Sequence, residues 1–438
     1  MRILYRRCAG LDVHKTSVVA CVLMVQDGNR VTEQVRRFGT MTEDLRELAA
    51  WLKSEQVERV AMESTGVYWK PVWNILEAAG LELLLANAQQ VKALPGRKTD
   101  QKDSQWLADL LMHGLLRNSF VPGRVIRDLR DLTRSRARLA QWHGTIANRI
   151  QKVLEDANIK LASVASDVLG ASGRLMLQAI MQGKTDTNVL ADLSKGRLRA
   201  KIPELRKALD GQVSGHHRLL LRRYWEQFQF LEKQLAKADA EIARRMKYAP
   251  EELAAVQAAL PAGAPLPPCP RQVALRYWME LPGISVVSGS SIVAEIGADM
   301  AQYPSAAHLA SWSTLCPGHD ESAGKRRSGR TRKGNKWLRR TMSEAAWAAS
   351  HSSGTYFAAQ FRRIAARRGK KRANMAVAHS LLVTGYTMLT HQCHYREVGA
   401  SFFNSLHPDK IKNSALKKLQ ALGYDVTLKT TAAESSAH

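Results

Sequence analysis

The chain has 438 residues, of which 65 are Lys or Arg and 39 are Asp or Glu, giving a formal net charge of +26. Hydrophobic residues make up 45% of it, which excludes a wholly disordered polycation. No segment reaches the ~18 uninterrupted apolar residues of a membrane span and the first residues lack a signal-peptide core, so we expect a cytoplasmic protein with no membrane partner.

The positive charge increases along the chain. The net charge is +3 over residues 1–125, +9 over 126–270 and +14 over 271–438. A nearly neutral first part beside a strongly basic last part is typical of a catalytic fold joined to a nucleic-acid-binding region. A basic surface without a partner is the alternative. The five cysteines contain no CxxC pair, and we interpret them as reduced and structural.

Residues 1–125 predict a mixed α/β sheet of RNase H type. Residues 9–38 alternate as a three-stranded meander with a hairpin turn at 27–29. Thr40 and Glu43 have capping-box spacing before a helix that places Leu45, Leu48, Ala49 and Leu52 on one face. A strand (57–64), a helix (68–79), a strand (81–86) and a helix from about 101 to 116 follow, and this alternation is typical of such a sheet.

Residues 126–260 predict long helices. Apolar residues repeat at heptad spacing in two segments. The first segment contains Leu129, Leu132, Leu139, Ile146, Ile150 and Val153, with Arg136 and His143 at the remaining heptad positions. The second contains Tyr224, Phe228, Leu231, Leu235, Ala238 and Ile242. We expect an antiparallel coiled-coil arm or a dimer seam, with a small helical insert at 163–215. Ordinary bundle packing is the alternative.

The last part of the chain begins after a Pro-rich linker at 261–272. Residues 273–400 predict a mainly α-helical domain, and 401–438 a polar, loosely ordered tail. The turn at Pro282 and Gly283 is similar to a helix-hairpin-helix, but Ser285 stands in place of the second glycine common in such turns. A turn that serves only packing is an equal alternative.

Four acidic residues indicate a metal site. Asp12 lies in an apolar strand, where a carboxylate is costly to bury unless a cation neutralises it. Glu63 ends a later strand, and Asp100 and Asp103 lie at i, i+3 spacing where a helix starts. Carboxylates at one sheet edge suit Mg²⁺, which serves phosphodiester chemistry. The structural alternatives are helix capping by Asp100 or Thr99, a first-turn position for Asp103 that suits the helix dipole, and a surface position at the strand end for Glu63.

The segments GLDVHK (10–15), MESTGVYW (62–69) and KTDQKDSQWLADLL (98–111) resemble motifs of the insertion sequence 110 family of transposases, also called DEDD transposases. Residues 281–349 resemble the C-terminal domain of that family. The resemblance implies a RuvC-like DEDD catalytic domain (1–125), a coiled-coil arm (126–260) and a C-terminal transposase domain (273–400). It further implies an acidic tetrad of Asp12, Glu63, Asp100 and Asp103.

The resemblance also implies a partner set and a nucleophile. Members of such a family act as RNA-guided DNA recombinases, in which a structured bridge RNA pairs with target and donor DNA, and a homo-dimer or tetramer is expected. The position that matches the nucleophilic serine is Ser322, in HDESAGKRR. Such a serine stores the energy of the broken phosphodiester in a covalent link. Ser311, Ser313 and Ser328 are rival candidates, and without the resemblance Ser322 is an ordinary loop serine.

Two basic clusters are expected to contact phosphates. The first puts nine cations into sixteen residues, namely Lys325, Arg326, Arg327, Arg330, Arg332, Lys333, Lys336, Arg339 and Arg340. The second comprises Arg362, Arg363, Arg367, Arg368, Lys370, Lys371 and Arg372. A solvated charged face is the alternative for both.

Three functions follow as hypotheses. The preferred one is an Mg²⁺-assisted DNA transposase or recombinase that forms a phosphoserine link. The second is a metal-dependent junction nuclease that uses water as the nucleophile. The third is a non-catalytic nucleic-acid-binding scaffold.

Overall fold

The computed structural model describes residues 3–26, 30–64, 66–86, 103–116, 118–261, 263–317, 320–322, 325–328, 334–406 and 408–428. The chain folds into two compact units, Met1–Pro122 and Gly123–His438, which are described separately. None of the helices in the described ranges is both long enough and apolar enough to cross a membrane.

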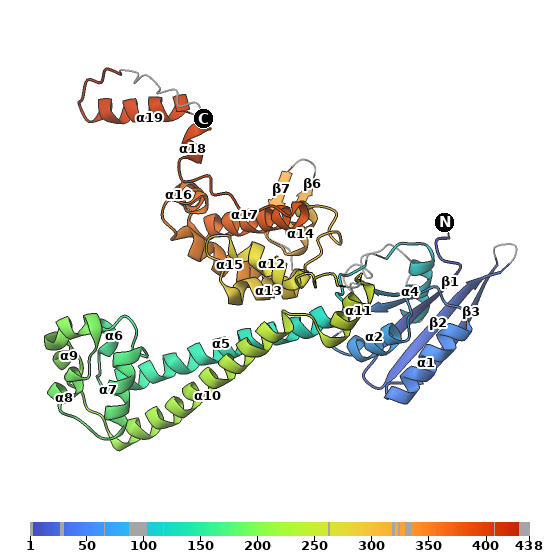
Figure 1. Ribbon diagram of the computed structural model, residues 1–438, viewed down its shortest axis with the longest axis horizontal. Helices are drawn as coiled ribbons and strands as arrows, with labels where there is room; N and C mark the ends of the chain where they lie inside the picture. The colour runs from blue at the N-terminus through green and yellow to red at the C-terminus, as the bar shows by residue number, and fades with distance from the viewer. Residues whose placement is uncertain are drawn as a thin grey trace. The chain divides into compact units, whose positions relative to one another are not determined.

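The first unit is built on a five-stranded sheet (Figure 1). Its strands are β1 (Arg7–Val13), β2 (Ser17–Val25), β3 (Val31–Gly39), β4 (Arg59–Glu63) and β5 (Leu83–Ala86). Their order is β3-β2-β1-β4-β5. The first three strands pair antiparallel, which confirms the predicted meander, and β4 and β5 continue the sheet parallel to β1. The predicted turn at 27–29 lies outside the described residues.

Helices cover both faces of this sheet. The helices α1 (Thr42–Ser54) and α2 (Trp69–Ala78) share one core with alternate residues of β1, whereas α4 (Asp103–Met112) packs on the opposite face with Cys8 and Cys21. Burial raises the pKa of both thiols to about 12, so they behave as small apolar side chains. The last helix was predicted to reach residue 116 but ends at Met112, because Gly114 turns the chain at φ +68°.

The predicted capping box of α1 is wrong by one residue. The N-cap is Met41, whose backbone N–H donates to the Asp44 carboxylate at 3.1 Å. The Thr40 hydroxyl instead donates to the Lys15 carbonyl at 3.0 Å. The predicted apolar face is confirmed, since Leu45, Leu48, Ala49 and Leu52 are all buried.

In the second unit, two long helices form an antiparallel pair within one chain. They are α5 (Arg124–Asp156) and α10 (Gly215–Arg245). Arg136 Nε lies 2.8 Å from Asp239, and the rings of His143 and Phe228 stack with centroids 4.1 Å apart. Phe228, Leu231 and Ile242 are buried as predicted, while Trp225 is buried beside the partly buried Tyr224 that the heptad assigned. The intramolecular pair is therefore confirmed, and a seam between two chains stays a prediction.

Short helices follow at the far end of this pair and in the rest of the unit. They are α6 (Leu161–Val164), α7 (Ala171–Met181), α8 (Thr187–Asp192), η2 (Gly196–Lys201), α9 (Ile202–Ala208) and α11 (Pro250–Ala259). The first five form a core with the ends of α5 and α10. The helices α6 to α9, with η2, correspond to the helical insert predicted at 163–215.

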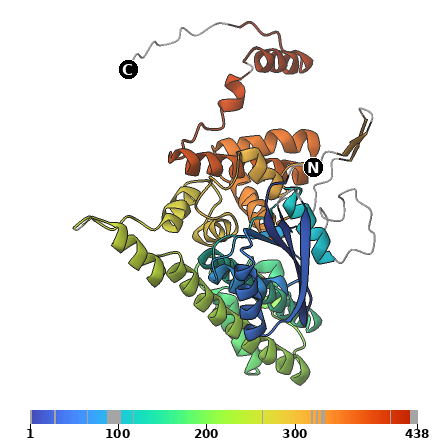
Figure 2. The ribbon, with the colours of Figure 1, turned by 90° about the vertical axis from the view of Figure 1, so that its right-hand side faces the viewer.

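The remaining chain forms a helical body that carries one small hairpin (Figure 2). Its helices are α12 (Pro270–Met279), α13 (Val286–Ile296), α14 (Ala306–Trp312), α15 (Lys336–Ser350), α16 (Tyr356–Arg368) and α17 (Lys370–His391). The hairpin consists of β6 (Asp320–Ser322) and β7 (Lys325–Ser328), and it projects from the helices. Two further helices, α18 (Phe402–Ser405) and α19 (Pro408–Ala421), occupy the region predicted to be a loosely ordered tail.

The turn at Gly283 serves packing. Its φ is +81°, and a Cβ at this position would lie 2.4 Å from the carbonyl oxygen of Ala345 on α15. The Ser285 hydroxyl accepts from the Ser288 N–H and caps α13. These contacts favour the packing interpretation over a phosphate-binding hairpin.

The contact between α4 and β1 is closest at Gly10. A Cβ at Gly10 would lie 2.2 Å from the Ser104 carbonyl oxygen and 2.4 Å from the Ala108 backbone nitrogen. Further along, the Cys8 thiol donates to the Ala108 carbonyl, and the Leu4 N–H donates to the Met112 carbonyl. The helix thus runs antiparallel to β1, and its N-terminal end lies toward the carboxyl end of that strand.

Gly10→Ala is expected to destabilise the first unit by about 2 kcal/mol or more, because the added methyl group meets backbone atoms that cannot rotate away. Urea denaturation followed by circular dichroism measures the change. Gly144→Ala is the control: that glycine lies within α5 with open space around it, and alanine should stabilise the helix by up to about 1 kcal/mol. An unchanged midpoint for Gly10→Ala would contradict the close packing.

Candidate functional site

Two of the predicted acidic residues lie side by side at one sheet edge. The parallel strands β1 and β4 pair with Leu11 opposite Met62, so Asp12 and Glu63 are the next positions in the same register. Both belong to the face that α4 covers, since they alternate with residues of the opposite core. Asp12 keeps 26% of its side chain exposed, so its carboxylate is accessible from solvent.

Asp103 belongs to the helix that lies over this same face. It is the first residue of α4, and it is exposed. Since the N-terminal end of α4 lies toward the carboxyl end of β1, Asp103 is placed at the end of the sheet where Asp12 and Glu63 also lie. Asp100, the fourth predicted acid, lies outside the described residues.

His14 is a site residue that the sequence analysis did not assign. Its Nε2 lies 2.9 Å from Asp12 Oδ2, at a side chain that is 62% exposed. The i, i+2 spacing of Asp12 and His14 is the sequence feature from which this contact was predictable, because an extended chain places such residues on the same side. The carboxylate of Asp12 thus has a polar partner at the edge where a ligand could bind.

The chemistry of the donor set suits a hard divalent cation. Asp12, Glu63 and Asp103 offer only carboxylate oxygens, which Mg²⁺ prefers to nitrogen or sulfur ligands. Among the described residues, however, no three Asp, Glu, His or Cys side chains gather closely enough to form a metal site. The described part of the chain therefore provides suitable ligand types at one edge without assembling a complete coordination sphere.

Ser322 lies in a β-hairpin rather than in a loop. It is the last residue of β6 and pairs with Lys325, while Glu321 pairs with Arg326. Of the rival serines, Ser313 is completely buried and its hydroxyl donates to the Ala310 carbonyl at 3.0 Å, which removes it as a nucleophile. Ser311 lies in α14 and Ser328 in β7.

The first basic cluster is spread over the hairpin and the following helix. Lys325, Arg326 and Arg327 belong to β7, while Lys336, Arg339 and Arg340 belong to α15. Arg330, Arg332 and Lys333 lie outside the described residues. Arg340 forms an ion pair with Glu344 at 2.8 Å, so its charge is partly balanced.

Trp337 is a second residue that the sequence analysis did not assign. Cations from two helices lie within 6 Å of its ring centre: Arg134 and Arg138 of α5, and Lys336 of α15. Such contacts combine electrostatic attraction with packing. These contacts bring the basic N-terminal end of α15 against α5. The sequences of the two helices, taken separately, do not predict this packing.

The second basic cluster surrounds the turn between α16 and α17. All seven of its cations are exposed, and the described contacts of the protein include no ion pair to any of them. Lys370, Lys371 and Arg372 occupy the first turn of α17. The positive end of a helix dipole disfavours cations at this place, so they do not serve the stability of the helix. Their position favours an external anion.

Family comparisons match both ends of this architecture. The DEDD-type IS110 family model, described as a transposase, matches residues 9–159. The model described as transposase IS116/IS110/IS902 family matches residues 275–362. A search of curated proteins finds no match. The chain therefore contains IS110-family transposase domains, which support a general function as a DNA transposase or recombinase and the use of a divalent metal.

Replacing Lys370, Lys371 and Arg372 with Gln is expected to weaken DNA binding and at the same time to stabilise the fold. The slope of the logarithm of the DNA-binding constant against the logarithm of the salt concentration should become shallower by about 2 to 3. The reason is that binding with three fewer phosphate contacts releases fewer counterions from the DNA. Removing three cations from the start of α17 should raise the unfolding free energy by about 1 kcal/mol. Fluorescence anisotropy and thermal melts measure the two effects.

Arg244→Gln is the matched control, since Arg244 is exposed but paired with Glu241 at the end of α10. It should leave the salt slope unchanged. A triple variant that binds DNA with wild-type affinity and slope would show that this cluster is only a solvated surface.

Proposed function

Because the chain contains both transposase domains of the IS110 family, we propose that it is an RNA-guided DNA recombinase that works through a phosphoserine link at Ser322. The observation that carries the proposal is the pairing of Asp12 and Glu63 at one sheet edge with the N-terminal end of α4. A hairpin that puts Ser322 opposite Lys325 provides the second part.

The first unit supplies the acidic part of the site. Its strand order, with carboxylates at the ends of the central strand β1 and its parallel neighbour β4, supports an RNase H-type catalytic domain. Asp12, Glu63, Asp100 and Asp103 would hold Mg²⁺. When bound, this cation polarises a phosphodiester and stabilises the developing charge on its oxygens. His14 would orient the Asp12 carboxylate through the observed hydrogen bond.

The second unit supplies the nucleophile. The hydroxyl oxygen of Ser322 forms a bond to the phosphorus as the bond from phosphorus to a deoxyribose oxygen breaks. The serine loses its proton to a base, and the leaving oxygen gains one. Reversal with a different strand's hydroxyl group rejoins DNA without ATP, because the energy of the bond is kept in the phosphoserine. The cations of β7 and α15 suit the phosphates on either side of the reacting one.

The partners follow from the family resemblance and from the charge. The proposal includes target DNA, donor DNA, a structured bridge RNA and a homo-dimer or tetramer that works in the cytoplasm. The net charge of +26 and two clusters of cations support polyanionic partners in general. We also propose the domain limits 1–125, 126–260, 261–272, 273–400 and 401–438 given by the sequence.

One observation favours hydrolysis as a second candidate function. A His beside a carboxylate, as in the 2.9 Å contact of His14 with Asp12, is an arrangement that can activate water. The protein would then be a metal-dependent junction nuclease with no covalent intermediate. The two functions differ in whether Ser322 is needed for strand cleavage.

Ser322→Ala is expected to abolish the covalent protein–DNA adduct and strand exchange, since alanine has no hydroxyl group to accept the phosphoryl group. Denaturing gel electrophoresis with end-labelled DNA, bridge RNA and Mg²⁺ measures the adduct. Ser311→Ala, an exposed serine of α14 in the same body, is the control and should keep the adduct. Full cleavage by Ser322→Ala would favour the hydrolytic nuclease.

Asp12→Asn is expected to lower metal-dependent strand cleavage by about a hundredfold or more, because a neutral amide is a poorer ligand for a hard cation. Thermal melts provide an independent measurement: Mn²⁺ should raise the melting temperature of the wild type more than that of the variant. Asp44→Asn, which alters only the cap of α1, should change stability and leave cleavage intact. Equal cleavage by Asp12→Asn and the wild type would contradict the metal-binding role of Asp12, whereas absence of cleavage by the wild type itself would support the scaffold hypothesis.

A further inference from the structure

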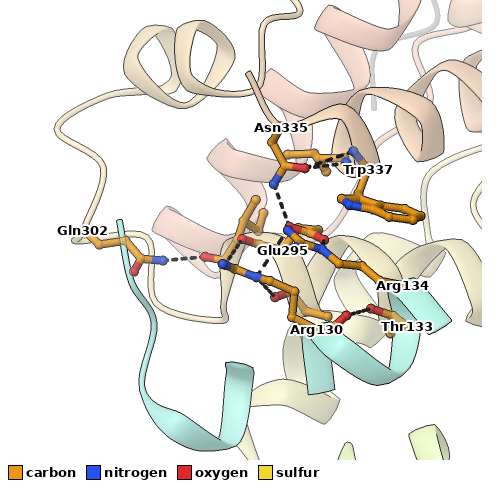
Figure 3. Close-up of polar contacts among 10 residues, drawn as sticks. Arg130, Thr133, Arg134, Glu295, Gln302, Asn335 and Trp337 are labelled. Carbon is orange, nitrogen blue, oxygen red and sulfur yellow. Dashed lines mark hydrogen bonds and ion pairs between the residues drawn. The ribbon is translucent and has the colours of Figure 1, made fainter. Parts of the chain in front are cut away.

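A buried carboxylate joins three helices of the second unit (Figure 3). Glu295, near the end of α13, has only 3% of its side chain exposed. Arg134 of α5 donates to both of its carboxylate oxygens, through Nε at 2.7 Å and Nη2 at 2.8 Å. The Asn335 side-chain amide donates to the same carboxylate at 2.6 Å. A bidentate arginine pair with a third donor fixes the geometry of this carboxylate closely.

Arg130 adds further contacts between α5 and the end of α13, around the same carboxylate. Its guanidinium donates to the backbone carbonyls of Ala294 and Glu295, and its Nε lies 3.4 Å from the Glu295 carboxylate. Burial is the largest influence on Arg130 and lowers its pKa, while the Glu295 carboxylate opposes this shift. Two arginines therefore converge on one acid, and its loss removes the carboxylate that both of them contact.

Asn335 links Glu295 to the start of α15. Its side-chain oxygen accepts from the N–H groups of Trp337 and Leu338, both at 3.1 Å, and so caps α15, while its amide group reaches Glu295. The preceding Gly334 packs so tightly that a Cβ would lie 2.2 Å from Thr314 Cγ2. In the sequence, β6 and β7 lie between Thr314 and Gly334, so two positions of the helical body that flank the hairpin lie close together.

We propose that Glu295 is a positioning residue for Ser322: through Arg134 and Asn335 it holds the start of α15, the helix that follows the hairpin in the chain, against α5. The inference rests on the proposed function, because it assigns Glu295 a role in the step that Ser322 performs. Glu295 does not contact DNA in this proposal; it acts through the hairpin. Binding of DNA should therefore survive its loss, while the rate of the covalent step should not.

Glu295→Gln tests this role against a matched control. We expect the rate of adduct formation by the full-length protein, with bridge RNA, DNA and Mg²⁺, to fall at least about tenfold. DNA affinity at equilibrium should stay within about twofold. Glu252→Gln removes a carboxylate that binds a buried arginine, Arg271, in the same bidentate manner at 2.8 and 2.6 Å, but this pair lies between α11 and α12. That control should lose similar thermal stability and keep the adduct rate.

Asn335→Ser provides the second test, since it does not leave a buried cation unpaired and so remains informative if Glu295→Gln fails to fold. Serine is a good N-cap, so α15 keeps its start, but the amide link to Glu295 is lost. The adduct rate should fall about threefold to tenfold. Thr355→Ser, the equivalent change at the N-cap of α16, should have no effect on this rate.

The outcomes separate the two proposals. A wild-type protein that forms no adduct overturns both. A wild-type protein that forms the adduct, together with Glu295→Gln and Asn335→Ser variants that react as fast as their controls, overturns the positioning role and leaves the proposed function standing. Loss of DNA affinity in parallel with the adduct rate also overturns the positioning role, because it shows a general structural defect.

Discussion

The candidate site depends on one close contact, the passage of α4 directly over Gly10 of β1. A side chain at this position would meet the backbone of Ser104 and Ala108, so only glycine allows the helix to lie this near the strand. The contact fixes both the distance and the direction of α4, whose N-terminal end then lies at the carboxyl ends of β1 and β4. Asp103 owes its place beside Asp12 and Glu63 to this contact, whereas the pairing of β1 with β4 brings those two acids together.

A second constraint acts in the other unit. A hairpin of seven strand residues has no core of its own, and its position depends on how its two ends are held. The contact of Gly334 with Thr314 and the cluster of Glu295, Arg130, Arg134 and Asn335 fix the helical body on both sides of the hairpin in the sequence, and in our proposal this positions the hairpin. Buried ion pairs contribute little net stability, so this cluster suits a role in defining local geometry better than a role in stabilising the fold.

The sequence was sufficient for features that local patterns determine. Alternation of apolar residues predicted the meander, and heptad spacing predicted two long helices that pack together. Features that depend on distant partners were missed. Glu295 lies in an apolar helical stretch, VAEIG, and its arginines are more than 160 positions earlier. Trp225 was missed because Tyr224 fits the same heptad spacing. The capping box was predicted with Thr40 and Glu43, but α1 begins one residue later, so Met41 is the N-cap and Asp44 supplies the carboxylate.

The central proposal is that the Ser322 hydroxyl group performs the covalent step and that Asp12, Glu63, Asp100 and Asp103 bind the metal ion that assists it. Its most direct test is mass spectrometry of peptides from protein trapped on DNA and digested with protease and nuclease. The account predicts a single modified peptide that carries a nucleotide on Ser322. A nucleotide on any other side chain, or efficient strand joining by a protein whose peptides all remain unmodified, would contradict it.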